Sequence, residues 1–171
     1  MHIVVVGAEL EENLAIRYLW GALERAGHNV GIVVFNNKDH VETAARQIAN
    51  SGALIAGFSM VFTHRAREFA SLATRARALG YSGHIVAGGH FAAFNAEQLL
   101  NDVPAFDSVA IGEGEALICE LATHLDDLSR VDGLVWRDGD RIIRNTPARK
   151  TSDLDTLAVP PRRKPFYEYL G

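Results

Sequence analysis

The sequence predicts an α/β fold: a five-stranded parallel sheet with helices on both faces, followed by a C-terminal β-hairpin and an extended arm. Three observations support this. Short β-branched or apolar runs recur five times between His2 and Gly112, helical periodicity fills the intervals, and glycine follows most of the runs. Strands that alternate with helices in this way form parallel sheets covered on both faces.

The first two strands are predicted where apolar residues run without interruption. His2–Gly7 is a β-branched run closed by glycine, which is typical of a strand buried on both faces. Apolar residues then recur at helical spacing over residues 10–26, and Gly27 ends that helix. Asn29–Phe35 is the second predicted strand, and residues 41–49 form the second predicted helix.

The same alternation continues as far as residue 125. Asn95 with Gln98 resembles a capping pair that opens a short helix. The remaining strands are predicted at Ala53–Ser59, His84–Gly89 and Phe106–Gly112, and the remaining helices at residues 66–76, 95–100 and 117–125.

The pattern changes near Ser129. Val131–Asn145 predicts a β-hairpin, because the turn-forming pair Asp138-Gly139 lies between two apolar stretches. Residues 146–171 carry four of the five prolines, so we expect an extended arm. Its apolar residues leave two interpretations open: the arm packs on this domain, or it leads into a partner domain. We therefore expect an α/β domain at residues 1–128, and a hairpin with a linker arm at residues 129–171.

Composition excludes several classes of function. The net charge of −4 and the lack of a basic cluster argue against a nucleic-acid partner. No apolar run reaches the roughly 18 residues of a membrane helix, and the N-terminus is typical of a strand rather than a signal peptide. Cys119 is the only cysteine, so this chain alone holds neither a disulfide framework nor an iron–sulfur cluster. We expect a cytoplasmic protein.

Unusual residues follow four of the predicted strands. Ligands of open parallel sheets bind beyond the carboxyl ends of the strands, and glycine there leaves room for a ligand to approach the main chain. We therefore predict a ligand site along this edge. The four segments are Gly7-Ala8-Glu9, Ser59-Met60-Val61-Phe62-Thr63, Gly88-Gly89-His90 and Gly112-Glu113-Gly114-Glu115.

Each segment also has an interpretation without a ligand. The paired glycine fits a tight strand-to-helix turn, and the hydroxyl residues fit helix caps. The two glutamates fit the first turn of a helix, where carboxylates favour the helix dipole. Familiar sites are missing from the sequence: it has no GxGxxG after the first strand, no phosphate loop and no metal-ligand spacing among its histidines. No Ser–His–Asp set is visible from spacing, and we expect neither catalytic residues nor protein ligands to a metal.

The sequence as a whole resembles a known family, the N-terminal cobalamin-binding domain of cobalamin-dependent radical S-adenosylmethionine enzymes. The matching segments run in the family's order over nearly the whole chain. They are ENLAIRYLWGALERAGHNV, ALIAGFSMVFTHRA, AGGHFAAFNAEQLL, VAIGEGEALICEL, VDGLVWRDGDRIIRN and DLDTLAVPPR.

The resemblance implies a flavodoxin-like (Rossmann-like) fold with the corrin ring on the carboxyl edge of the strands. It places Ala8, Glu9 and Thr63 among the cofactor-binding residues. It also implies that Ser59, Met60, Val61 and Phe62 contact the corrin or its nucleotide tail. By the same match, Gly88, Gly89 and His90 line the tail groove, and Gly112, Glu113, Gly114 and Glu115 lie near the tail's base and ribose.

Two departures from the family pattern change what is expected. Corrinoid carriers related to methionine synthase have a DxHxxG loop after the first strand, whose histidine binds cobalt, whereas residues 7–13 here contain no histidine. We therefore expect base-off cobalamin without a histidine ligand from this loop. The CxxxCxxC motif is also absent, and the chain stops at Gly171, where a radical SAM domain would begin.

We accordingly expect a fragment that is not catalytic by itself, with the iron–sulfur cluster and S-adenosylmethionine bound only by the missing downstream domain. That domain is the expected partner, and methyl transfer is the implied chemistry of the whole enzyme. Two alternatives stay open: a stand-alone corrinoid carrier or sensor, and a flavodoxin-like signalling or nucleotide-binding module without a corrinoid.

Overall fold

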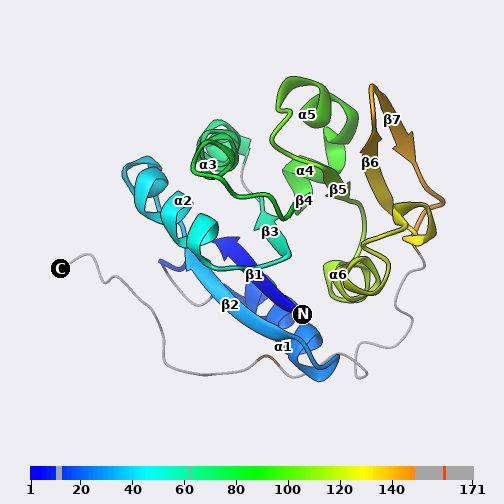
Figure 1. The fold of residues 1–171 in the computed structure, drawn as a ribbon, viewed down its shortest axis with the longest axis horizontal. Coiled ribbons are helices and arrows are strands. Elements are labelled where there is room, and N and C mark those ends of the chain that lie inside the picture. Colours follow the sequence, from blue (N-terminus) through cyan, green and yellow to red (C-terminus); the bar gives the residue numbers. More distant parts are fainter. Residues whose placement is uncertain (11–12, 62, 149–159, 161–171) are drawn as a thin grey trace.

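A single seven-stranded sheet forms the centre of the molecule (Figure 1). The computed structural model describes residues 1–10, 13–61, 63–148 and 160. The strand order is β2-β1-β3-β4-β5-β6-β7. The strands are β1 (His2–Gly7), β2 (Asn29–Val34), β3 (Ile55–Ser59), β4 (His84–Gly88), β5 (Ser108–Ala110), β6 (Leu134–Asp138) and β7 (Arg141–Arg144).

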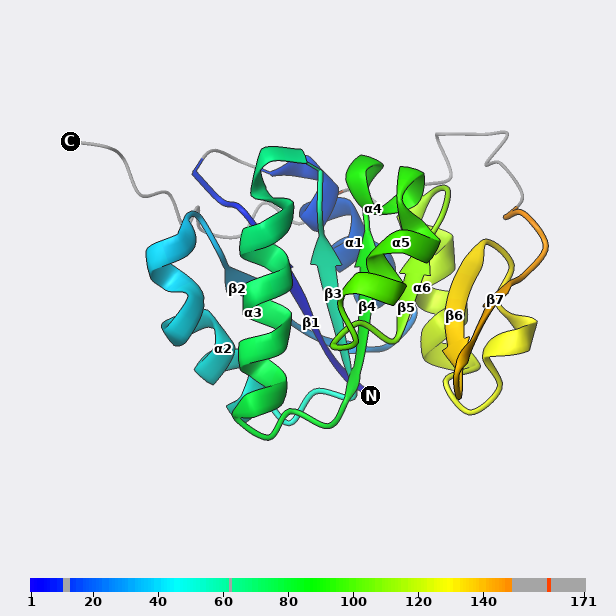
Figure 2. The ribbon, with the colours of Figure 1, turned by 90° about the horizontal axis from the view of Figure 1, so that it is seen from above.

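Helices cover both faces of the sheet. In Figure 1, α1 and α6 lie below it and α2 to α5 lie above it, and Figure 2 looks onto the upper layer. None of the helices among the described residues is both long and apolar enough to span a membrane. The helices are α1 (Leu14–Arg25), α2 (Val41–Asn50), α3 (Ala66–Ala78), α4 (His90–Phe94), α5 (Ala96–Asp102) and α6 (Gly114–Thr123), with short 3-10 turns η1 (Lys38–His40), η2 (Thr63–Arg65) and η3 (Leu128–Arg130).

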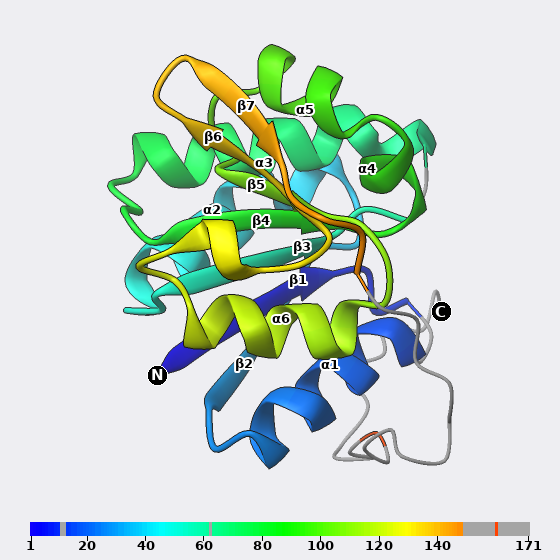
Figure 3. The same cartoon turned by 90° about the vertical axis from the view of Figure 1, so that its right-hand side faces the viewer.

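The strand directions confirm a mostly parallel α/β sheet with two more strands than predicted. Strands β1 to β5 are parallel in the order 2-1-3-4-5, which is typical of flavodoxin-like folds. The predicted hairpin, β6 with β7, joins the same sheet, because β6 pairs antiparallel with β5 (Figure 3). The hairpin thereby covers the edge that β5 would otherwise leave open. The division at residue 128 stays a prediction.

Two apolar cores flank the sheet, because alternate residues of the strands face opposite sides. Val4, Phe58 and Ala87 face α2, α3 and α5. Ile3, Val5 and Val86 face α1 and α6. Gly57 and Gly88 lie on the α1–α6 side, because they alternate with Phe58 and Ala87 of the other core, and this is the side that concerns the candidate site.

The helices α4 and α5 and the C-terminal arm differ in detail from the sequence prediction or fall outside the described residues. The helix α4 was not predicted, and His90 is its first residue. Asn95 is the N-cap residue of α5, as predicted, but its side chain makes no capping hydrogen bond. Its Nδ2 donates instead to the carbonyl of Phe91, 2.8 Å away. The predicted extended arm falls almost entirely on residues 149–159 and 161–171, outside the described residues.

Candidate functional site

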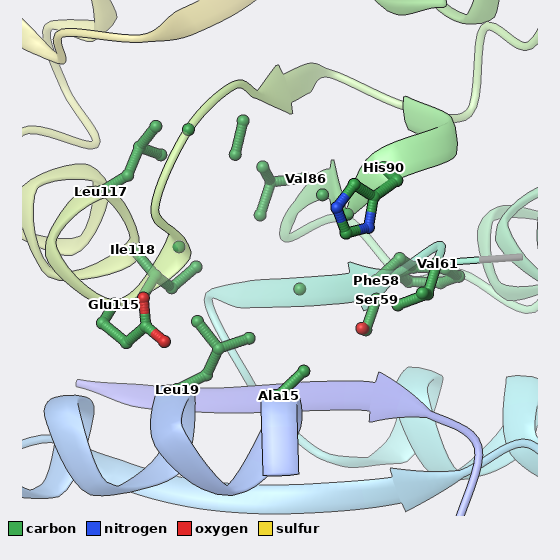
Figure 4. Close-up of a pocket in the computed structure, with 16 residues that line it drawn as sticks. Ala15, Leu19, Phe58, Ser59, Val61, Val86, His90, Glu115, Leu117 and Ile118 are labelled. Carbon is green, nitrogen blue, oxygen red and sulfur yellow. The ribbon is translucent and has the colours of Figure 1, made fainter. Parts of the chain in front are cut away.

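A cavity of about 260 Å³ opens between the sheet and the helices α1 and α6 (Figure 4). We call it the slot. It lies at the carboxyl ends of β3, β4 and β5, and its lining is mostly apolar. The lining residues are Ala15, Leu19, Gly57, Phe58, Ser59, Val61, Val86, Gly88, Gly89, His90, Ala110, Gly112, Gly114, Glu115, Leu117 and Ile118.

Two strand glycines lie against the slot without being required by packing. A Cβ at Gly88 would meet only the Ala110 Cβ, at 3.8 Å, and a Cβ at Gly57 would meet Ile118 Cδ1 at 3.6 Å. Both distances are ordinary van der Waals contacts. Glycine inside a strand destabilises by about 0.5–1 kcal/mol relative to alanine. Glycine at these two positions therefore costs stability without a packing reason, which makes this side of the sheet a candidate for ligand contact.

The walls come from α1 and α6, which pack against each other. Ala15 and Leu19 are one helical turn apart on α1 and both line the slot (Figure 4). A Cβ at Gly114 would lie 2.9 Å from Leu19 Cδ2. Glycine at the start of α6 thus lets the two helices close over the slot.

Gly89 has a different role from Gly88. Its φ of 92° and ψ of 172° lie in a region that essentially only glycine adopts. Its Cβ would fall 2.9 Å from the carbonyl oxygen of Met60. The amide of Met60 in turn donates to the carbonyl of Gly88, at 2.7 Å. Glycine at position 89 therefore allows the turn after β4 to pack closely against the turn after β3. Glycine at position 88 instead leaves room for the slot.

Gly89→Ala is expected to destabilise the domain by about 2–3 kcal/mol, because it combines backbone strain with a clash. Gly80→Ala is the matched control, since Gly80 has a φ of 94° but no atom within 4 Å of its Cβ position. We expect this control to cost only about 1 kcal/mol. Urea unfolding followed by circular dichroism measures both, and equal losses would contradict the clash.

The loop after β1 is held by a buried ion pair instead of facing the slot. Glu9 and Arg17 are both fully buried, and Arg17 Nη2 lies 2.6 Å from Glu9 Oε2. The amide of Glu9 donates to Asn36 Oδ1 at 2.8 Å, and Asn13 caps α1. Among the described residues of this loop, Glu9 is thus held by Arg17 and does not line the slot.

The structure gathers eight of the fourteen predicted site residues around the slot and places the others elsewhere. Ala8, Glu9, Thr63 and Glu113 do not line it, and Met60 is buried in the opposite core. Phe62 lies outside the described residues. The eight lining residues are Ser59, Val61, Gly88, Gly89, His90, Gly112, Gly114 and Glu115. Cofactor contact stays a prediction for the whole set.

Half of the lining residues were not predicted. Gly57 carried a usable signal, because a glycine in the middle of a buried strand needs an explanation. The others are apolar residues of a kind that fills any core, so nothing in the sequence separates them from ordinary packing. They are Ala15, Leu19, Phe58, Val86, Ala110, Leu117 and Ile118.

A Ser–His–Asp set, which spacing did not reveal, lies at the opposite edge of the sheet. His84 Nε2 is 2.7 Å from Ser108 Oγ, and His84 Nδ1 is 4.0 Å from Asp107 Oδ2. Ser108 is fully buried, and the Asp107 carboxylate accepts from Arg77 and from the amide of Ile85. With its serine closed off from substrate, the set ties β4 to β5. No cluster of three or more metal-ligating side chains occurs in the described part of the chain.

This set predicts a pH-dependent stability. Burial lowers the pKa of His84, the Asp107 carboxylate opposes this and Arg77 adds to it. The folded state thus disfavours the protonated imidazole, whereas the unfolded chain takes up the proton near pH 6.5. Stability is complete above that pH and falls below it, by up to about 1.4 kcal/mol per pH unit. Urea unfolding at pH 7.5 and 5.5 measures the loss, which should be smaller in His84→Gln. If His84→Gln loses as much stability at pH 5.5 as the unmodified protein does, other titratable groups cause the loss.

Comparison with known proteins identifies the family. The family profile described as the B12 binding domain matches residues 2–122. The chain belongs to the B12-binding domain family. The matched range contains every element that lines the slot.

Two proteins that this chain resembles are considerably longer than it is. It is 37% identical, over 78 residues, to the anaerobic magnesium-protoporphyrin IX monomethyl ester cyclase of Synechocystis sp. (strain ATCC 27184 / PCC 6803 / Kazusa), a stretch that is 44% of this chain and 16% of the cyclase. Its fold matches the radical S-adenosylmethionine methyltransferase TsrM from Kitasatospora setae, solved with cobalamin and a 4Fe–4S cluster, with a TM-score of 0.73 and 21% identity. That match covers 96% of this chain and 31% of TsrM. These findings confirm the resemblance stated from the sequence.

Proposed function

We propose that this domain binds cobalamin with the nucleotide tail in the slot and the corrin ring on the carboxyl edge of β1, β3 and β4. The observation that carries the proposal is the slot beside Gly57 and Gly88, two strand positions that would accept a Cβ at ordinary contact distance and yet are glycine. Bound cobalamin would supply its cobalt as the reactive centre. The domain would bind and orient the cofactor.

The volume of the slot supports the tail as its occupant. An engineered cavity of about 150 Å³ holds one benzene ring. The slot, at about 260 Å³, has room for a base of two fused rings but not for a corrin. The macrocycle must then remain outside, over the strand ends.

Exposed apolar side chains support a broad ligand at that edge. Leu10 follows β1, Leu14 starts α1 and Phe94 ends α4, and their exposed fractions are 46%, 50% and 85%. All three follow strands on the edge where the slot opens. Exposed apolar side chains after these strands would be available to a broad ligand at this edge.

We also propose that the cobalt receives no histidine from the loop after β1. The loop has none, and its Glu9 is engaged by Arg17. Base-off binding is the consequence of placing the tail's base in the slot, away from the metal. The Co(II) form should therefore show no nitrogen superhyperfine splitting in its EPR spectrum, and such splitting would contradict the proposal.

For the whole protein we propose a cobalamin-dependent radical SAM enzyme, with methyl transfer as its reaction class. The chain spans 31% of TsrM and 16% of the cyclase, so a larger protein around this domain is consistent with both relatives. Residues 1–128 would form the cobalamin domain and residues 129–171 the connection to the radical SAM domain. Iron–sulfur cluster and S-adenosylmethionine would belong to that second domain.

The test is direct binding. The purified protein is mixed with hydroxocobalamin and desalted, and its visible spectrum is recorded. We expect about one equivalent to be retained, and loss of all colour would overturn the proposal. A CxxxCxxC motif encoded beyond Gly171 would support the radical enzyme, and its absence would favour a stand-alone carrier or sensor.

A further inference from the structure

The deep part of the slot offers no hydrogen-bonding groups. Gly57 pairs with Val5 of β1 and Val86 of β4, and Val86 pairs also with Ser108 of β5. Main-chain groups in the middle of such ladders are used within the sheet. The side chains that complete this region are apolar: Leu19, Ala110, Leu117 and Ile118.

Three of the residues that line the slot have polar side chains. Among the lining residues, Ser59 ends β3, His90 starts α4 and Glu115 lies in the first turn of α6 (Figure 4). The ribose and phosphate of a nucleotide tail are polar, and its base enters first. The slot is thus apolar beside Val86, whereas Ser59 and His90 lie at the ends of β3 and β4 and Glu115 lies beside Leu19 and Ile118 (Figure 4).

We infer that the slot selects corrinoids by the polarity of their lower base, preferring dimethylbenzimidazole to adenine. The inference rests on the proposed function, because it assigns the base of the tail to the slot. Both bases are fused two-ring systems, so volume separates them little. Adenine carries an amino group and additional ring nitrogens, which would lose water on entry and find no partner beside Gly57 and Val86.

The expected size of the preference for dimethylbenzimidazole follows from the polar groups that adenine would bury without partners. Apolar pockets discriminate against one added polar group by roughly 100-fold. We therefore expect adenine-based cobamide to bind about 100-fold more weakly than cobalamin. A cobamide with a p-cresol base, which is apolar and smaller, should bind more tightly than the adenine form.

The experiment measures dissociation constants of cobalamin, adenine cobamide, p-cresol cobamide and the tailless cobinamide with the same protein. The expected order of affinity is cobalamin, then p-cresol cobamide, then adenine cobamide. Equal affinity for cobalamin and adenine cobamide, with cobinamide weaker than both, would overturn this inference and leave the proposed function standing. If cobinamide binds as tightly as cobalamin, or no corrinoid binds, the proposed use of the slot fails and the inference fails with it.

Two variants distinguish the effect of a polar group in the slot from a general loss of stability. Val86→Thr puts a hydroxyl beside the base with almost no change of shape, and should reduce the preference for cobalamin about 10-fold. Val30→Thr makes the same change in β2, outside the slot, and should leave the preference unchanged. If Val86→Thr leaves the preference at its original value, the base does not lie beside Val86 and the inference is wrong.

Discussion

Gly88→Leu is expected to lower the affinity for cobalamin by a factor of about 100 while the domain stays folded. A Cβ here would meet only the Ala110 Cβ, at 3.8 Å, and Gly88 lines the slot, so we expect the rest of a leucine side chain to extend into it. An aromatic base buries on the order of 150–250 Å², which at about 25 cal/mol per Å² contributes about 4–6 kcal/mol. Ordering the tail offsets part of this, and a net loss of about 3 kcal/mol is a factor of roughly 100.

Three controls make this result specific. Gly88→Ala should weaken binding less than Gly88→Val, and Gly88→Val less than Gly88→Leu, because the side chains fill the slot progressively. Cobinamide lacks the tail and should bind Gly88→Leu and the unmodified protein equally. Urea unfolding should show stability within about 1 kcal/mol of the original, since the leucine replaces a strand glycine and fills empty space. Unchanged cobalamin affinity in a folded Gly88→Leu protein would exclude the slot as the tail site.

Arg17→Met is expected to destabilise the domain by about 3–5 kcal/mol, the range for breaking a buried ion pair by removing one partner. The side chains of Arg17 and Glu9 are 2% and 0% exposed, so the carboxylate would be left buried beside a neutral group. The change also removes the contact of the guanidinium with the Trp20 ring, 5.6 Å away. Urea unfolding measures the loss, which is large for a domain of this size.

An exposed pair of the same length is the matched control. Arg144 Nη2 lies 2.6 Å from Glu97 Oε1, with both side chains about half exposed. Arg144→Met should cost less than about 1 kcal/mol. Adding Glu9→Gln to Arg17→Met should restore much of the loss, because the uncompensated charge is then gone. Equal losses at the two pairs would show that burial is not what makes the Glu9–Arg17 pair important.

The periodic elements of the fold were predictable because each strand and helix is specified by its own residues. The alternation of β-branched runs with helical periodicity gave β1 to β4 and their helices within a few residues. What escaped prediction depends on contacts between segments far apart in the sequence. The pairing of β6 with β5 is one such case, and the Ser108–His84 contact across two strands is another.

The candidate site shows the same limit. Gly88 and Gly89 were predicted together as one feature and both line the slot, yet only Gly89 also carries a turn, with a φ of 92°. Ile118 and Leu19 looked like ordinary core residues, and only the approach of α6 to α1 makes them slot walls. Sequence alone pointed to the edge at which we propose that the ligand binds, because glycines follow several strands there. The depth and polarity of the slot required the packed helices.

A crystal structure of the protein with hydroxocobalamin tests the proposed binding mode most directly. We predict density for the lower base between α1 and α6, against Gly57 and Gly88, with the corrin over the ends of the parallel strands. A cofactor bound elsewhere, or a tail in solvent above a slot filled by Leu19 and Ile118, would contradict it.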